Sequence, residues 1–314
     1  MQMELGPHEL ACVFKQLTDP ADIARVYAVC RLWRDAVKSL HIDGFPLIDV
    51  LRLEPNEILE TACRAGSLEL AKYAISCGAT SFNNGLDVAC RGGHTEIAEL
   101  MISRDANGFN WGLYKACCGG HKEMAELMIS RGATHFDLGL YGACRSSHKE
   151  LAELMCGLGA TDFNFGLSGA CEGGSKEIAE LMIRRGATDF DEGLNRACVG
   201  GRKEMAELMI SRGATKFDWG LHTACEGGQK ETAELMIKHG ATHFEGGLIR
   251  ACCGGRKELV ELMISRGATN FGGGLNTACY NGHTEIAKLL GSLAPRSVCL
   301  HCGKRGAKHG AKHA

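Results

Sequence analysis

Prolines and aromatic residues are scarce in this chain of 314 residues, which has 5 prolines and 6% aromatic residues. The shortage of proline argues against a collagen-like chain and against a Pro-rich linker protein. Lys+Arg 35 against Asp+Glu 37 leaves a formal net charge of -2, so no whole-chain attraction to nucleic acid or to an anionic membrane follows. The sequence lacks any run of about 18 consecutive apolar residues, so we expect no membrane-spanning helix.

The first residues also lack a basic segment followed by an apolar one, which argues against a secretory signal. We therefore expect a cytoplasmic protein. Hydrophobic residues make up 45% of the chain and charged residues 23%, enough to form a sizeable core. Glycine is abundant, with 42 residues, and there are 17 cysteines. Glycine without proline suggests a short turn that is used many times.

The dipeptide Ala-Cys recurs with a strict period. Its cysteine returns every 27 residues, with no insertion or deletion, at Cys63, Cys90, Cys117, Cys144, Cys171, Cys198, Cys225, Cys252 and Cys279. The unit reads G-L-x-x-A-C-x-G-G-x-K-E-x-A-E-L-M-I-x-R-G-A-T-x-F-x-x. We expect nine units over residues 58–295, with atypical first and last units that cap a solenoid.

Each unit has the pattern of two helices. The first is short, buries Leu86, Ala89 and Cys90 and stops at the glycine pair 92–93, and its remaining residues should face outward. The second is amphipathic and is followed by a glycine suited to a left-handed C-cap. An Asn or Asp after the repeat's Phe should cap the next first helix: Asn83, Asn110, Asp137, Asn164, Asp191 and Asp218.

The run from Gly85 to Ile102 resembles the ankyrin repeat, from its P-L-H-x-A-A element through G-H-x-E-V-V-x-L-L-L. The pair Gly132-Ala133 after a second helix also fits. An ankyrin unit usually has about 33 residues, and the residues missing here come from the β-hairpin finger. The resemblance implies an all-α, ankyrin-like helical-hairpin solenoid, whose first helices face the concave side. Binding modes that rely on fingers are not expected.

Most of the recurring cysteines and methionines are interpreted as core residues, because small and flexible apolar side chains suit closely stacked helices. The histidines at the ankyrin G-H position should bond to the backbone in the turn: His94, His121, His148 and His283. No catalytic set of residues or phosphate-binding loop interrupts the repeat. We expect a non-catalytic binding protein without a cofactor, except for a candidate zinc site in the tail.

Residues 1–42 precede the repeats and resemble an F-box. The segments Pro7–Leu10, Val13–Leu17, Asp19–Ile23 and Val29–Arg34 follow its L-P-x-E-L, I-L-x-x-L, D-P-x-D-L and V-C-R-x-W-R elements, with Gly6 and Thr18 as departures. The resemblance implies docking to the Skp-type adaptor of a cullin ubiquitin ligase through an amphipathic helical face. The residues expected there are Pro7, Leu10, Val13, Phe14, Leu17, Ile23, Val26, Val29, Leu32 and Trp33. The alternative is a helical cap on the solenoid.

A connector of residues 43–57 would lead into the array, and residues 296–314 form a basic tail. In the tail, Cys299, Cys302, His309 and His313 have the spacing C-x2-C-x6-H-x3-H. Two thiolates and two imidazoles suit tetrahedral zinc, although the central gap is short for a zinc finger. The alternative is a disordered basic tail without metal.

Variable residues on the first helices are candidates for target binding, because aromatic and Arg residues are the usual interface anchors. They are Trp111, Tyr114, Lys115, Tyr141, Phe165, Arg196, Trp219, His222, Arg250 and Tyr280. The favoured function is a ubiquitin-ligase adaptor that holds an unknown target protein. A plain interaction scaffold is the alternative, and a nucleic-acid role is disfavoured by the charge. The combination of an F-box with ankyrin repeats is similar to that found in proteins of large DNA viruses. A viral origin would place this protein in the host cytoplasm, and a eukaryotic origin is the alternative.

Overall fold

The computed structural model describes residues 41–42, 45–46 and 53–294. Two short strands, β1 (His41–Ile42) and β2 (Phe45–Pro46), pair antiparallel with Ile42 opposite Phe45. From residue 55 onward the described chain is a helical repeat array, which confirms the predicted all-helical, ankyrin-like solenoid. The only strands in the described residues are this pair, which the sequence did not predict. No helix of the described chain is long and apolar enough to cross a bilayer.

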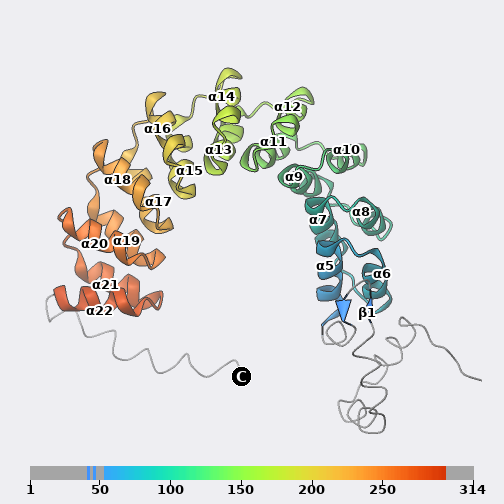
Figure 1. The fold of residues 1–314 in the computed structure, drawn as a ribbon, viewed down its shortest axis with the longest axis horizontal. Coiled ribbons are helices and arrows are strands. Elements are labelled where there is room, and N and C mark those ends of the chain that lie inside the picture. Colours follow the sequence, from blue (N-terminus) through green and yellow to red (C-terminus); the bar gives the residue numbers. More distant parts are fainter. Residues whose placement is uncertain (1–40, 43–44, 47–52, 295–314) are drawn as a thin grey trace, which may run out of the picture. The chain divides into compact units, whose positions relative to one another are not determined.

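The described residues contain eighteen helices, arranged as pairs that repeat along the chain (Figure 1). The first helices of the pairs are α5 (Pro55–Ala65), α7 (Phe82–Gly92), α9 (Phe109–Gly119), α11 (Phe136–Arg145), α13 (Phe163–Gly173), α15 (Phe190–Gly200), α17 (Phe217–Gly227), α19 (Phe244–Gly254) and α21 (Phe271–Tyr280). The second helices are α6 (Leu68–Ser76), α8 (Thr95–Ile102), α10 (Lys122–Ser130), α12 (Lys149–Gly157), α14 (Lys176–Arg184), α16 (Lys203–Ser211), α18 (Lys230–Lys238), α20 (Lys257–Ser265) and α22 (Thr284–Leu293).

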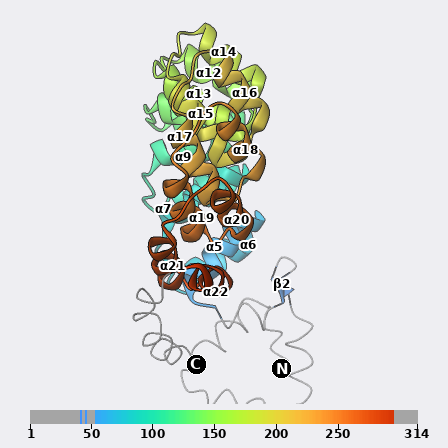
Figure 2. The same ribbon diagram turned by 90° about the vertical axis from the view of Figure 1, so that its left-hand side faces the viewer.

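The array consists of two compact units. Unit 1 comprises the described residues up to 143 together with 153–159, and unit 2 comprises 144–152 together with the described residues from 160 onward. Within unit 1, α5 contacts α7 and α7 contacts α9, while α6 contacts α8. In unit 2, α13, α15, α17, α19 and α21 contact one another in sequence order. Each unit therefore has one layer of first helices and one layer of second helices, as the turned view of α15 to α20 also shows (Figure 2).

The core is built from the positions that the repeat holds constant. Leu86, Ala89 and Cys90 are completely buried, as are their equivalents in the units up to Cys252, and Met101 is buried beside them. In the last unit the equivalent Cys279 is only half-buried. The repeat's opening glycine is required by this packing. A Cβ at Gly85 would lie 2.7 Å from Met101 Sδ and 3.2 Å from Cys63 Sγ of the preceding repeat. Larger residues would therefore push neighbouring repeats apart.

The glycine turns follow the prediction. Gly93 follows the last residue of α7 with φ 74°, a left-handed conformation that glycine adopts readily because it has no Cβ. Its amide donates hydrogen bonds to Ala89 O and Cys90 O. Gly132 after α10 has φ 100°. The first helix therefore reverses directly into the second helix, and the second reverses into the next repeat. With 11 residues, α7 is longer than the predicted short helix and longer than α8, which has 8 residues.

The Asn and Asp residues after the repeat's Phe do not cap their own helices, so that prediction is wrong. Helix α7 begins at Phe82 itself, after the N-cap Ser81, and Asn83 lies inside the first turn. Its Oδ1 instead accepts hydrogen bonds from Asn107 N (2.8 Å) and Gly108 N (3.0 Å). We call this contact the inter-repeat amide clamp. The same two-amide clamp is made by Asn56, Asn110, Asn164, Asp191, Asp218 and Glu245.

A second inter-repeat contact forms at the other end of the first helices. His283 Nε2 lies 3.0 Å from Cys253 O in the last turn of α19, which fits the predicted backbone bond of this histidine. Arg202 Nε donates to Glu172 O at 3.3 Å from the equivalent position. Because the last carbonyls of a helix have no partner within that helix, these side chains satisfy them from the next repeat.

Candidate protein-interaction surface

The exposed aromatic side chains lie on the layer of first helices. Trp111 on α9, Phe165 on α13 and Trp219 on α17 each stand one residue before the repeat's opening glycine and are 45%, 36% and 40% exposed. The glycine that follows is buried in the array, so the residue before it sits at the rim of the packed face. Exposed aromatic rings of this kind supply large contact area to a protein partner.

In unit 1 four predicted residues form one group, which we call the aromatic cluster. The rings of Trp111 and Tyr114 have centroids 4.7 Å apart, and Tyr114 stacks on Tyr141 with centroids 6.4 Å apart. Lys115 Nζ lies 5.0 Å from the Trp111 centroid and 5.5 Å from that of Tyr114. A cation over aromatic rings at this range is held by the ring quadrupoles, so the cluster presents a positioned ammonium group beside an exposed indole.

The prediction that all variable positions of the first helices face outward is wrong at several of them. Tyr114 and Tyr141 are half-buried, while Ser168 and Asn195 are 7% and 6% exposed. The cause is the close stacking of successive first helices. Tyr114 lies against the next repeat at Gly142, where an added Cβ would be 2.9 Å from Tyr114 Cδ2. These tyrosines therefore contribute to packing between repeats as well as to the surface.

A cavity of about 490 Å³ opens beside the aromatic cluster, between α5, α7 and α9. We call it the α5–α9 pocket. Its polar, charged and aromatic lining residues are Arg64, Asn84, Asp87, Arg91, Trp111 and Lys115. Three of them are cations and one is a carboxylate, so a polar ligand is expected rather than an apolar one.

The carboxylate in the pocket has an unusual environment. Burial raises the pKa of Asp87 to about 6, against the opposing effect of the nearby Lys115 ammonium. Arg64 is paired on its own helix, where its Nη2 lies 2.5 Å from Glu60 Oε1. Arg91 is exposed at the end of α7. The positive character of the pocket therefore comes mainly from Arg91 and Lys115.

In unit 2 the predicted residues are spread over successive first helices. Arg196 on α15 pairs with Glu192 one turn earlier, with Nε 2.6 Å from Oε1. Lys216 Nζ lies 5.9 Å from the Trp219 ring centroid. Tyr280 at the end of α21 is 88% exposed. In contrast to the aromatic cluster, these side chains form a row of separate contacts along the layer.

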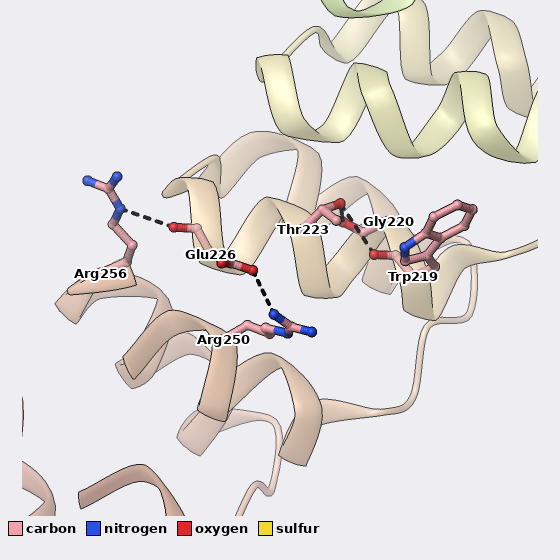
Figure 3. A network of polar contacts seen from close by, with 6 residues as sticks. All are labelled: Trp219, Gly220, Thr223, Glu226, Arg250 and Arg256. Atoms are coloured by element: carbon pink, nitrogen blue, oxygen red, sulfur yellow. Dashed lines mark hydrogen bonds and ion pairs between the residues drawn. The ribbon is translucent and has the colours of Figure 1, made fainter. Parts of the chain in front are cut away.

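Glu226 on α17 joins unit 2 repeats through both its carboxylate and its backbone (Figure 3). Arg250 Nη1 donates to its Oε2 at 3.1 Å, and Arg256 Nε donates to its carbonyl oxygen at 3.4 Å. The predicted binding residue Arg250 is thus already engaged in an ion pair. His222 on the same helix stacks on His243, with ring centroids 6.3 Å apart.

The predicted adaptor-binding and zinc sites belong to the segments before and after the array. The adaptor-binding residues lie outside the described residues, as do the four candidate zinc ligands: Pro7, Leu10, Val13, Phe14, Leu17, Ile23, Val26, Val29, Leu32, Trp33, Cys299, Cys302, His309 and His313. Within residues 53–294, no group of three or more His, Cys, Asp or Glu side chains is arranged to hold a metal ion.

Comparison with known families supports the resemblance of the first repeats to ankyrin repeats. A family model for ankyrin repeats (3 copies) matches residues 59–139. That range runs from α5 into α11 and includes most of the aromatic cluster and all of the pocket residues. A search of curated proteins finds no match to the chain. Residues 59–139 are therefore similar to ankyrin repeats, which generally serve as non-catalytic scaffolds for protein–protein interaction.

Sequence reasoning missed the pocket residues Arg64, Asp87 and Arg91. They occupy the same variable repeat positions as the predicted residues: Asp87 corresponds to Tyr114, and Arg64 and Arg91 correspond to Tyr280. The sequence therefore carries a signal for them, because these positions vary while the rest of the unit repeats. Only the structure shows that these three side chains border one cavity with Trp111 and Lys115.

Proposed function

We propose that this protein is the target-recognition subunit of a cullin-type ubiquitin ligase. The F-box-like segment, residues 1–42, docks the Skp-type adaptor, and the ankyrin-type array binds a target protein through its first helices. A single protein with both surfaces would bring the target to the ligase without performing catalysis itself.

The observation that carries the target-binding half is the aromatic cluster on the first helices of unit 1. Exposed Trp111 beside the Lys115 ammonium is the kind of anchor that dominates protein interfaces. The ligase half rests on the sequence from Val29 to Arg34, which matches the F-box element V-C-R-x-W-R. An array that held a target without this segment would be an ordinary scaffold, which is the alternative function.

Binding of the purified Skp-type adaptor to the full chain tests the ligase half. We expect Trp33→Ala to abolish binding, because the indole belongs to the apolar face that the resemblance assigns to adaptor docking. Trp219→Ala is the matched control, since it removes an exposed indole from the array, and it should leave adaptor binding unchanged. Circular dichroism of both variants would show that the array keeps its helical content.

Adaptor binding that survives both Trp33→Ala and deletion of residues 1–40 would contradict the ligase function. The protein would then be an interaction scaffold whose N-terminal segment serves only the array.

A further inference from the structure

We propose that the α5–α9 pocket binds an anionic side chain, a carboxylate or a phosphate, presented by a peptide segment of the target protein. This proposal rests on the proposed function, because it assumes that the array recognises a protein. It goes further by naming the site and the chemistry of the segment that would be recognised.

The first argument is the charge of the lining. Arg64, Arg91 and Lys115 line the pocket, and Asp87 is the single lining carboxylate. Since Glu60 already pairs with Arg64, Arg91 and Lys115 supply the charge that an anion would meet. A guanidinium can bind a carboxylate or phosphate through two parallel hydrogen bonds, which gives both strength and geometric selectivity.

The second argument is that the array does not need these cations for packing. The position of Arg64 and Arg91 in later repeats is held by Glu172, Val199 and Glu226, among others. Repeats of the same fold therefore form with a neutral or acidic residue at this place. The packing of the array therefore does not require an arginine at the positions of Arg64 and Arg91.

The third argument is preorganisation. The contacts of Lys115 with the Trp111 and Tyr114 rings hold its ammonium group at the pocket before a ligand arrives. A side chain that is already positioned loses less conformational entropy on binding. The exposed face of Trp111 gives the backbone and apolar side chains of a peptide a surface beside the anion site.

The fourth argument is size. A volume of about 490 Å³ falls in the range of ordinary ligand sites, roughly 300–1,000 Å³. A pocket of this size accommodates an acidic side chain together with the adjacent residues of a peptide, and it is too small for a folded domain. A short linear segment is therefore the occupant that fits.

Fluorescence anisotropy with the full chain tests the proposal. Three labelled peptides share a Gly-Ser framework and differ at a central triplet: Glu-Leu-Glu, Gln-Leu-Gln, or phosphoserine-Leu-phosphoserine. We expect at least one anionic peptide to bind about tenfold more tightly than the Gln peptide at physiological salt. Whichever anionic peptide binds more tightly identifies carboxylate or phosphate as the source.

Two pairs of substitutions locate the binding. Arg91→Gln with Lys115→Gln should weaken the anionic peptide about tenfold. Arg104→Gln with Arg131→Gln is the control, since it removes the same charge from exposed turn positions after α8 and α10 in the same unit. The control should change affinity by less than about twofold, because neither arginine lines the pocket and salt screens exposed charges.

One variant should improve binding, which damage to the fold could not explain. Asp87→Asn removes the lining carboxylate and should tighten the anionic peptide about threefold, by removing like-charge repulsion. Equal affinity for all three peptides, no measurable binding of either anionic peptide, or equal losses in the pocket and control variants would each overturn the pocket.

The pocket and the proposed function can fail separately. Target proteins captured equally by wild type and by the Arg91→Gln, Lys115→Gln variant would overturn the pocket and leave adaptor docking and target capture intact. Loss of adaptor binding has no effect on the peptide measurement, which uses only the array's own surface.

Discussion

At the scale of single residues, the recurring cysteines are buried thiols. Cys90, Cys117 and Cys171 are fully buried in the described core, and burial raises the pKa of each thiol from 9.0 to about 12. Because the thiolate is the reactive form, its population at neutral pH falls about a thousandfold for three pKa units. These residues should therefore be chemically inert in the folded protein.

Alkylation by iodoacetamide under native conditions at pH 8 tests this. We expect Cys118 and Cys253, which are half-buried next to buried neighbours, to be modified well before Cys117 and Cys252. Mass spectrometry of the digested protein would give the order, and alkylation in urea is the control for intrinsic reactivity. Modification of Cys117 at the same native rate as Cys118 would mean that the first-helix core opens readily.

Asp87 gives a second residue-scale prediction, through pH. Its folded pKa of about 6 lies above the ordinary 3.8, so between these values the folded state binds more protons than the unfolded state. The free energy of unfolding should then fall as pH rises through this window. Asp87→Asn removes the penalty and should stabilise the protein at pH 7.5, by at most about 1 kcal/mol after allowing for solvent screening.

Urea unfolding at pH 5 and pH 7.5 measures this effect. The gain from Asp87→Asn should be larger at pH 7.5, while Glu99→Gln, an exposed substitution on α8, should show no such difference. A gain that does not depend on pH would mean that burial does not disfavour the Asp87 charge.

At the scale of the elements, the periodic pattern predicted the helix pairs, the glycine turns and the core, because these depend on local spacing. It did not predict the inter-repeat amide clamp. Asn83 near a helix start is an equally good residue type for a cap or for a bridge. Only the packed repeat shows that its oxygen faces two amides 24 and 25 residues later.

The clamp can be tested by removing its acceptor. Asn83→Ala leaves the amides of Asn107 and Gly108 without their partner and should lower the free energy of unfolding by about 1–2 kcal/mol. Asn83→Asp keeps the oxygen and should cost much less. Asn84→Ala, at the exposed neighbouring position of α7, is the control in the same urea titration. Equal effects of Asn83→Ala and Asn84→Ala would show that the clamp adds no stability.

At the scale of the whole molecule, residue type alone predicts ten equivalent target-binding residues, whereas in the structure some of them form a cluster and others are paired with acidic side chains. Trp111, Tyr114, Lys115 and Tyr141 come together in one cluster because consecutive first helices are in contact. Arg196 and Arg250 already have acidic partners. The pairing of Arg196 with Glu192 follows from their spacing of four residues on one helix, whereas the pairing of Arg250 with Glu226 joins two repeats and could not be predicted from the sequence. Side-chain direction across the repeat interface decides the aromatic cluster and the Arg250 pair, and the repeat pattern does not encode that direction.

Affinity capture of cellular proteins by the full chain, compared across three variants, tests the proposed two-surface arrangement most directly. Trp111→Ala with Trp219→Ala should lose the captured target and keep the Skp-type adaptor, since each lost anchor at a true hot spot costs about 2 kcal/mol or more. Trp33→Ala should lose the adaptor and keep the target, and Arg104→Gln should keep both. Recovery of the same target proteins at the same level by the Trp111→Ala, Trp219→Ala variant would contradict target recognition by the first helices.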